Sequence, residues 1–209
     1  TITATAELTW GLLLCLSRKI PMAVRHVNNF KWDRNEFYGM ELNGKTLGVI
    51  GYGRLGELIA EYGNIFKMKI LIHEKNNELH NNNFAFVEIE ELLKNSDIIT
   101  IHINSSEKNK NFIDEKKFSF MKRKSILINT SRGDIIDEEV LIKKLESGYI
   151  AGAAMDVLQD EYSDDKNWIK HNKLINYARN NSNLLITPHI GGVTNDSTNK
   201  TNDFIIDKI

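Results

Sequence analysis

The first residues in this sequence that could do chemistry are three glycines at the start of an amphipathic segment. Gly51, Gly53 and Gly56 form a G-x-G-x-x-G motif that directly follows a short apolar run. The first glycine permits a tight turn, the second lets the backbone approach a phosphate, and the third lets a helix and a strand pack closely. The N–H groups of Arg54 and Leu55 at the helix start then attract a pyrophosphate. This context predicts a dinucleotide-binding turn.

An acidic residue follows the next apolar run at the distance that such a turn requires. Glu74 directly follows the run 69–73, about 20 residues beyond the glycines. A carboxylate here accepts hydrogen bonds from the adenosine ribose and repels a 2′-phosphate, which favours NAD over NADP as the cofactor. Lys75 beside it could instead help to hold a 2′-phosphate, so NADP stays open as the alternative.

The elements that must position these residues alternate along the chain from Lys45 onward. Helices are expected over 6–20, 55–66, 88–94 and 137–147, the last with Asp137 as its N-cap and Gly148 just past its end. The polar stretches 160–165 and 176–183 are typical of loops. Alternation of this kind implies right-handed crossovers and a sheet covered on both faces. The sequence therefore predicts an α/β fold with a doubly wound parallel sheet of the Rossmann type. The candidate strands are 46–50, 69–73, 98–103, 125–129, 151–157 and 184–187.

Composition excludes several other classes of protein. The 209 residues include 27 basic and 28 acidic side chains, so charge offers no reason to expect a nucleic acid or an anionic membrane as a partner. The longest apolar stretch, 12–16, is far shorter than the ~20 residues of a membrane span. A single Cys cannot form an intramolecular disulfide, which favours a cytoplasmic location. The histidines lack metal-ligand spacing, so no metal site is expected.

Three further motifs follow the glycine-rich turn. They are Asn-Thr-Ser-Arg-Gly at 129–133, Ala-Gly-Ala-Ala-Met-Asp-Val at 151–157 and Thr-Pro-His-Ile-Gly-Gly at 187–192. Together with Gly-Lys-Thr-Leu-Gly-Val-Ile-Gly-Tyr-Gly at 44–53, they resemble, in order, the signatures of the NAD-binding domain of the D-isomer-specific 2-hydroxyacid dehydrogenases. The likeness runs from about residue 4 to about residue 198, and the D-3-phosphoglycerate dehydrogenases are the members it resembles most.

The resemblance implies a catalytic trio of Arg132, Glu161 and His189 that serves hydride transfer between NAD(H) and C2 of a D-2-hydroxy acid. His189 suits the protonation of the carbonyl oxygen, because imidazole titrates near neutral pH. Glu161 would orient the ring and stabilise the imidazolium, and the planar fork of Arg132 would hold the substrate carboxylate. The family usually carries Pro after this Glu, whereas Tyr162 follows here, and the neighbouring Asp160 could do the same job.

The same resemblance places the nicotinamide end of the cofactor against loops that follow the later strands. Asp156 would bind the carboxamide there, and His102 is interpreted as a packed strand-end residue rather than a catalyst. Arg54 and Leu55 would contact the pyrophosphate, and Glu74 the ribose. The residues implied at the nicotinamide end are Thr130, Ser131, Arg132, Asp156, His189, Gly191 and Gly192.

Domain organisation and partners follow from the resemblance as well. Residues 1–192 would form the dinucleotide-binding domain, and 193–209 would begin the segment that returns to a substrate domain largely missing from the chain. The identity of the 2-hydroxy acid is therefore not specified. The family commonly forms homodimers through this domain, and the apolar face of the helix 6–20 suits such a contact, although burial within the chain explains the same pattern.

Two other functions share this cofactor fold. One is an NAD(H)-sensing interaction protein of the corepressor type, and the other is a different Rossmann dehydrogenase such as a formate dehydrogenase. The near-neutral charge favours the enzyme over the interaction protein.

Overall fold

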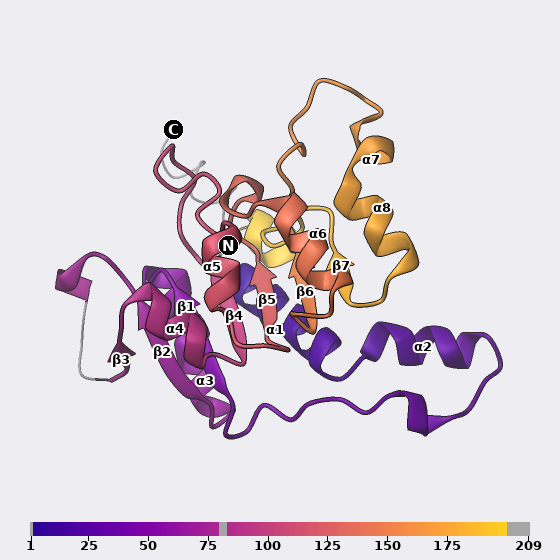
Figure 1. Cartoon of the computed structure of the whole chain (residues 1–209), viewed down its shortest axis with the longest axis horizontal. Coiled ribbons are helices and arrows are strands. Elements are labelled where there is room, and N and C mark those ends of the chain that lie inside the picture. Colours follow the sequence, from indigo (N-terminus) through magenta and orange to yellow (C-terminus); the bar gives the residue numbers. More distant parts are fainter. Residues whose placement is uncertain (1, 80–82, 200–209) are drawn as a thin grey trace.

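A computed structural model describes residues 2–79 and 83–199, in which seven strands form one parallel sheet. The strand order is β3-β2-β1-β4-β5-β6-β7 (Figure 1). This arrangement confirms the predicted α/β fold with a doubly wound parallel sheet. The strands are β1 (Thr46–Ile50), β2 (Lys69–His73), β3 (Ala85–Phe86), β4 (Ile98–Ile101), β5 (Ile126–Asn129), β6 (Gly152–Met155) and β7 (Leu184–Ile186).

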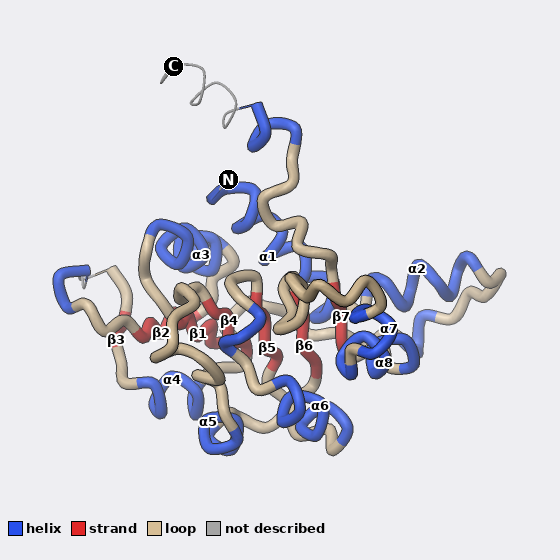
Figure 2. The backbone as a smooth tube through the Cα atoms, turned by 90° about the horizontal axis from the view of Figure 1, so that it is seen from above, coloured by secondary structure: helices blue, strands red, loops and turns tan. Residues whose placement is uncertain are grey.

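The central strands are apolar throughout because both faces of the sheet are covered. Every residue of β4, β5 and β6 is buried, and a strand buried on both faces loses the alternation of polar and apolar residues. Figure 2 shows α1 (Ile2–Ser17) and α3 (Arg54–Ile65) on one face of the sheet. The opposite face carries α4 (Ile89–Asn95), α5 (Glu115–Phe120) and α6 (Glu138–Glu146).

Local signals place the ends of α6 as expected. The Asp137 carboxylate accepts a hydrogen bond from the Val140 N–H at 3.1 Å, which caps the first turn. Gly148 has a φ of 63° just past the helix end, a conformation that costs glycine little.

The first predicted helix, 6–20, ends earlier than its pattern suggested, and a second helix follows it. After α1 the chain turns at Lys19, whose φ is 54°, and α2 (Ile20–Asn28) begins there. Pro21 explains the break, because it has no N–H to donate to the Ser17 carbonyl four residues earlier. The Met40 N–H donates to that carbonyl instead, at 2.7 Å. Figures 1 and 2 both show α2 projecting from the body of the domain.

The prediction of a loop over 176–183 is the clearest error, because five of these eight residues, 176–180, are helical. α8 (Lys173–Asn180) follows the short α7 (Trp168–His171) and lies beside β7. The Asn172 side chain caps α8 by accepting from the Ile175 N–H at 3.0 Å, and Leu174 is fully buried. Burial of one apolar side of a polar helix therefore outweighs its loop-like composition. The short 3-10 turns are η1 (Arg34–Glu36), η2 (Asn77–Leu79) and η3 (Gly133–Ile135).

Strand order decides where a ligand can bind. β1 lies between β2 and β4, so the connections leaving β1 and β4 run to opposite sides of the sheet. In such sheets the ligand crevice lies outside the carboxyl ends of the strands, at the point where the strand order reverses. The glycine-rich turn follows β1, and the three later motifs follow or end β5, β6 and β7. All four motifs therefore meet at one edge of the sheet.

Candidate active site

The glycine-rich turn has the geometry that a bound pyrophosphate needs. Gly51 has a φ of 94°, and a Cβ on Gly56 would lie 2.0 Å from the Gly51 carbonyl oxygen. A Cβ on Gly53, in contrast, would meet nothing within 4 Å. Gly53 also precedes the first turn of α3, so open space lies directly at a helix N-terminus. The residues present fit an anionic group of a dinucleotide at this position.

Substitution of these glycines should have two separate effects, a loss of stability at Gly56 and a loss of cofactor affinity at Gly53. Gly56→Ala puts a methyl group into backbone, so we expect the free energy of unfolding to fall by about 1–3 kcal/mol. Gly53→Ala fits the structure, because the φ of −79° suits alanine and a Cβ would meet open space. Its methyl group would occupy the pyrophosphate position, so we expect NADH affinity to fall roughly tenfold or more, with the melting temperature unchanged.

Urea unfolding and NADH fluorescence titration measure the two effects separately. Equal NADH affinity for Gly53→Ala and the unchanged protein would contradict the assignment of this turn to the cofactor.

Glu74 is held as an ionised carboxylate at the end of β2. It accepts hydrogen bonds from the Tyr52 N–H at 2.9 Å and the Asn76 N–H at 2.8 Å. Partial burial opposes ionisation, but the backbone donors at Asn76 and Tyr52 outweigh it and lower the pKa of Glu74. The charge therefore stands where the sequence predicted it, beside the glycine-rich turn.

A hollow of about 370 Å³ adjoins Glu74, between the ends of β1, β2 and β4. Lys75 is one of its lining residues, and its Nζ lies 5.7 Å from the ring centroid of Phe112. His102 forms another part of the wall, and its Nε2 lies 2.8 Å from the Thr100 hydroxyl. Burial lowers the pKa of His102 to about 3, so the ring is neutral at physiological pH. His102 is thus a packed strand-end residue, as its sequence position indicated.

The neutral ring of His102 predicts a loss of stability in mild acid. The unfolded chain binds a proton at this residue below pH 6.5, whereas the folded chain does so only near pH 3. This residue therefore costs no stability well above pH 6.5, and the free energy of unfolding declines as the pH falls below that value. From this group alone we expect the free energy of unfolding to fall by about 2 kcal/mol between pH 7 and pH 5.

Urea unfolding at both pH values, compared with His102→Gln, isolates that contribution, because glutamine does not titrate. An equal pH dependence in the two proteins would refute the prediction.

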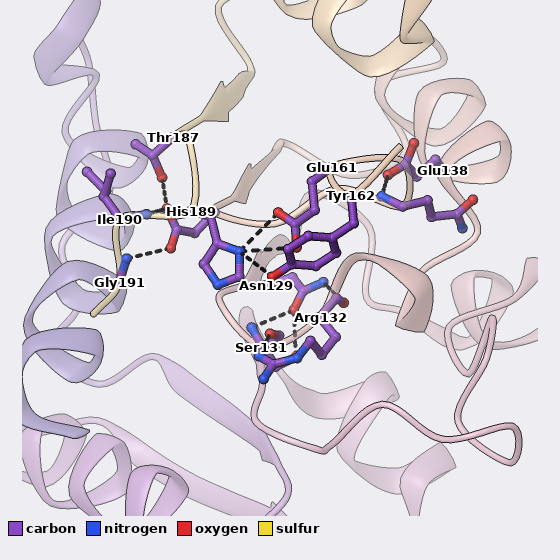
Figure 3. Close-up of polar contacts among 12 residues, drawn as sticks. Asn129, Ser131, Arg132, Glu138, Glu161, Tyr162, Thr187, His189, Ile190 and Gly191 are labelled. Carbon is purple, nitrogen blue, oxygen red and sulfur yellow. Dashed lines mark hydrogen bonds and ion pairs between the residues drawn. The ribbon is translucent and has the colours of Figure 1, made fainter. Parts of the chain in front are cut away.

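A buried amide shapes the turn that carries Arg132. The Asn129 Oδ1 accepts from the Ser131 N–H at 3.0 Å and from the Ser131 hydroxyl at 2.7 Å. The Asn129 Nδ2 donates to the Arg132 carbonyl at 2.8 Å. The guanidinium of Arg132 lies on the exposed side of this turn and donates to the Ser131 carbonyl at 2.6 Å (Figure 3). Asn129 was not among the predicted site residues, although a polar residue that ends an apolar strand could have indicated it.

Asp156 ties the loop after β7 to the end of β6. Its carboxylate is almost fully buried and accepts from the Ile190 N–H at 2.9 Å and the Gly191 N–H at 2.7 Å. The Thr187 hydroxyl donates to it at 2.5 Å. Asp156 therefore shapes the turn around His189, a structural task that the sequence analysis did not foresee.

Two of the three predicted catalytic residues, Glu161 and His189, meet at this turn. His189 Nδ1 lies 3.1 Å from each carboxylate oxygen of Glu161 (Figure 3). The Glu161 side chain is 12 % exposed and that of His189 is 37 % exposed, so the pair lies at the surface of the crevice with its carboxylate covered. Asp160, the alternative partner, is exposed, and Glu161 is the acid placed against the ring. His189 adopts a left-handed φ of 53°, which is uncommon for a residue other than glycine.

The first helix also contacts two of the loops that were predicted to lie at the nicotinamide, and these contacts were not expected from the sequence. The Thr9 and Thr130 hydroxyl oxygens lie 2.8 Å apart in a buried contact. The Thr5 hydroxyl donates to the Gly191 carbonyl at 3.1 Å. α1 therefore holds two loops of the site at once.

Other kinds of site receive no support from the described part of the chain. Over residues 2–79 and 83–199, the histidine, cysteine and acidic side chains form no group of three able to hold a metal ion. None of the helices in these ranges is long and apolar enough to cross a membrane.

Comparison with known proteins decides the family. The chain matches the D-isomer specific 2-hydroxyacid dehydrogenase, NAD binding domain, over residues 10–191. The chain belongs to this family. Glyoxylate reductase of Thermococcus litoralis is 35 % identical over 206 residues, covering 93 % of this chain and 59 % of the relative. D-3-phosphoglycerate dehydrogenase of Methanocaldococcus jannaschii is 34 % identical over 210 residues, covering 99 % of this chain and 38 % of the relative.

Solved structures of the family have the same fold. D-lactate dehydrogenase from Aquifex aeolicus, crystallised with NAD and lactic acid, matches with a TM-score of 0.90 and 31 % identity. That match covers 99 % of this chain and 65 % of the other. The cofactor expected from the glycine-rich turn is therefore confirmed as that of an NAD-binding domain. The chain spans between about two fifths and two thirds of the length of these relatives.

Proposed function

We propose that this protein is an NAD-dependent oxidoreductase that interconverts a D-2-hydroxy acid and the corresponding 2-oxo acid. The observation that carries the proposal is the pairing of His189 with Glu161 beside the nicotinamide loops. A histidine held by a carboxylate is a group that can both give and take a proton near neutral pH. The relatives named above are enzymes, which favours this function over the NAD(H)-sensing protein.

The proposed chemistry assigns one proton to His189. When bound, the cofactor supplies or accepts the hydride at C2. Negative charge grows on the carbonyl oxygen during reduction, and the Nε2–H of His189 protonates it there. In the reverse direction the neutral ring takes the hydroxyl proton. Glu161 accepts the Nδ1–H, which leaves Nε2 as the nitrogen facing the substrate.

Arg132 is the proposed anchor of the substrate. Its guanidinium is exposed beside the nicotinamide loops, and the rigid turn stabilised by Asn129 fixes the backbone that carries it. A planar fork can bind a carboxylate through two parallel hydrogen bonds and polarise the adjacent carbonyl. Binding of a carboxylate beside a polarised carbonyl explains why the proposed substrates are 2-oxo and 2-hydroxy acids.

The cofactor contacts remain as the sequence predicted them and are part of the proposal. The ionised Glu74 would accept hydrogen bonds from the ribose hydroxyl groups, which favours NAD. Lys75 is the residue that would support NADP. Asp156, already satisfied by three donors, has an unused lone pair for the carboxamide. Further contacts are proposed for Gly51, Gly53, Arg54, Leu55 and Gly56 at the pyrophosphate, and for Thr130, Ser131, Arg132, His189, Gly191 and Gly192 at the nicotinamide.

We also propose the domain division 1–192 and 193–209. The proposed site lies at one edge of the seven-stranded parallel sheet, and Gly191 in its last loop donates to Asp156. The second segment falls largely outside the described residues, since its positions 200–209 are not described.

A homodimer is the proposed assembly, and α2 with the segment after it supports this better than α1. The apolar side chains of α1 are buried or partly buried in this chain, with Trp10 and Leu13 among the buried ones. Val24 and Val27 are about half exposed, Phe30 is fully exposed and Trp32 is 91 % exposed. Large apolar side chains exposed together within one short segment favour an interaction surface. A monomer by sedimentation equilibrium at micromolar concentration would contradict the proposal.

An assay of the complete protein tests the function directly. NADH oxidation is measured with glyoxylate, hydroxypyruvate, pyruvate and 3-phosphohydroxypyruvate, each also with NADPH. We expect turnover of at least one oxo acid, with NADH preferred. Tight NADH binding without turnover of any 2-oxo acid would refute the enzyme. The cytoplasmic location stays a prediction of the sequence.

A further inference from the structure

Tyr162 stands directly after Glu161 and reaches the same imidazole. Its hydroxyl oxygen lies 3.4 Å from Nδ1 of His189, and the two rings meet edge to face with centroids 6.3 Å apart. Figure 3 shows the Glu161 carboxylate and the Tyr162 ring approaching the imidazole from the same side. The ring of Tyr162 therefore lies on the side of the histidine away from Nε2.

The chemistry of the three groups settles which way the proton is shared. The Glu161 carboxylate can only accept, so Nδ1 of His189 carries the hydrogen. A tyrosine hydroxyl both donates and accepts, and here its oxygen is the second acceptor for the Nδ1–H. The hydroxyl hydrogen of Tyr162 then points away from the imidazole.

His189 needs restraint beyond its contact with Glu161. The imidazole is more than a third exposed at the surface of the crevice, and the backbone of His189 has a left-handed conformation. Glu161 contacts a single nitrogen, so the ring can still rock about that contact. The edge-to-face packing of Tyr162 limits this motion, because it adds a ring contact and a second acceptor at Nδ1.

We propose that Tyr162 is a positioning residue that, together with Glu161, holds the imidazole of His189 with Nε2 toward the substrate. This inference rests on the proposed function. Tyr162 does not touch the substrate in this arrangement, since it lies at the distal nitrogen. Its effect is on how often His189 is correctly oriented for proton transfer, so it acts on kcat rather than on substrate binding.

The test compares Tyr162→Phe with Tyr38→Phe in the complete enzyme. Both tyrosines are 77 % exposed, so neither loss of a hydroxyl should affect folding, and Tyr38 lies outside the site. We expect Tyr162→Phe to lower kcat about two- to fivefold, as befits one weak exposed hydrogen bond, with KM for the 2-oxo acid and NADH affinity unchanged. Tyr38→Phe should match the unchanged enzyme. A rise in KM at constant kcat, or unchanged kinetics, would overturn the proposal.

A spectroscopic measurement separates this proposal from the proposed function, because it needs no turnover. In ¹⁵N-histidine-labelled enzyme, the Nδ1–H resonance of His189 is assigned by its loss in His189→Asn. We expect this resonance to move upfield in Tyr162→Phe, since the proton loses an acceptor, and to stay in place in Tyr38→Phe. An unmoved resonance overturns the contact even in an active enzyme. A moved resonance in a protein that reduces no 2-oxo acid would refute the function alone.

Discussion

Replacing His189 with asparagine is expected to lower kcat for 2-oxo acid reduction roughly 10²–10⁴-fold, the usual loss when one general acid is removed. Asparagine cannot supply the proton, but it tolerates the left-handed φ of 53° at this position better than alanine does. The turn held by Asp156 should therefore persist. NADH affinity, measured by fluorescence titration, should stay within about twofold, since one pocket contact changes little at the pyrophosphate.

Two companion variants sharpen this prediction. His171→Asn changes an exposed histidine of α7 and should leave kcat unaltered. Glu161→Gln keeps the size of the side chain but removes the charge that stabilises the imidazolium, so we expect a loss intermediate between the two histidine variants. Near-normal turnover by His189→Asn with intact NADH binding would show that another group is the acid.

The second large effect is expected at Arg132. Arg132→Ala removes the proposed fork for the substrate carboxylate, and hydrogen bonds to charged groups contribute about 1.5–3 kcal/mol each. For a two-bonded carboxylate we expect kcat/KM to fall roughly 10²–10⁴-fold, with most of the loss in KM. Arg132→Lys keeps the charge without the planar fork and should recover only part of the activity.

Arg123 provides the matched control for this experiment. It is also exposed, but it precedes β5, whereas Arg132 follows that strand, so the two lie at opposite ends of the same strand. Arg123→Ala should leave kcat/KM unchanged. If Arg132→Ala kept its KM for every 2-oxo acid that the enzyme reduces, the carboxylate would have to be bound elsewhere.

The elements with strong local signals were predictable from the sequence. The bounds 46–50 and 69–73 match β1 and β2, because an apolar run between turn residues carries its own information. Local signals failed where tertiary packing decides. β3 is only two residues long and depends on its pairing with Leu71 and Ile72, and α8 forms because its apolar side is buried against the domain.

The candidate site shows the same division. The types and order of its residues, from the glycine-rich turn to His189, are properties of the sequence, because each motif is short and local. The resemblance already favoured Glu161 over Asp160, but the contact of Glu161 with His189 could not be derived from local signals, since the two residues are 28 positions apart. Their contact depends on the loops after β6 and β7, which Asp156 ties together.

Two other contacts of the site could not be predicted from the sequence. Thr9 meets Thr130 across 121 positions, and Tyr162 reaches the distal nitrogen of His189 from a loop that composition alone marked as polar. The sequence by itself determined the α/β fold, the cofactor turn and the chemical groups available at the site. The tertiary structure decided which of those groups touch, because hydrogen bonds between distant loops depend on angstrom-scale placement by the sheet.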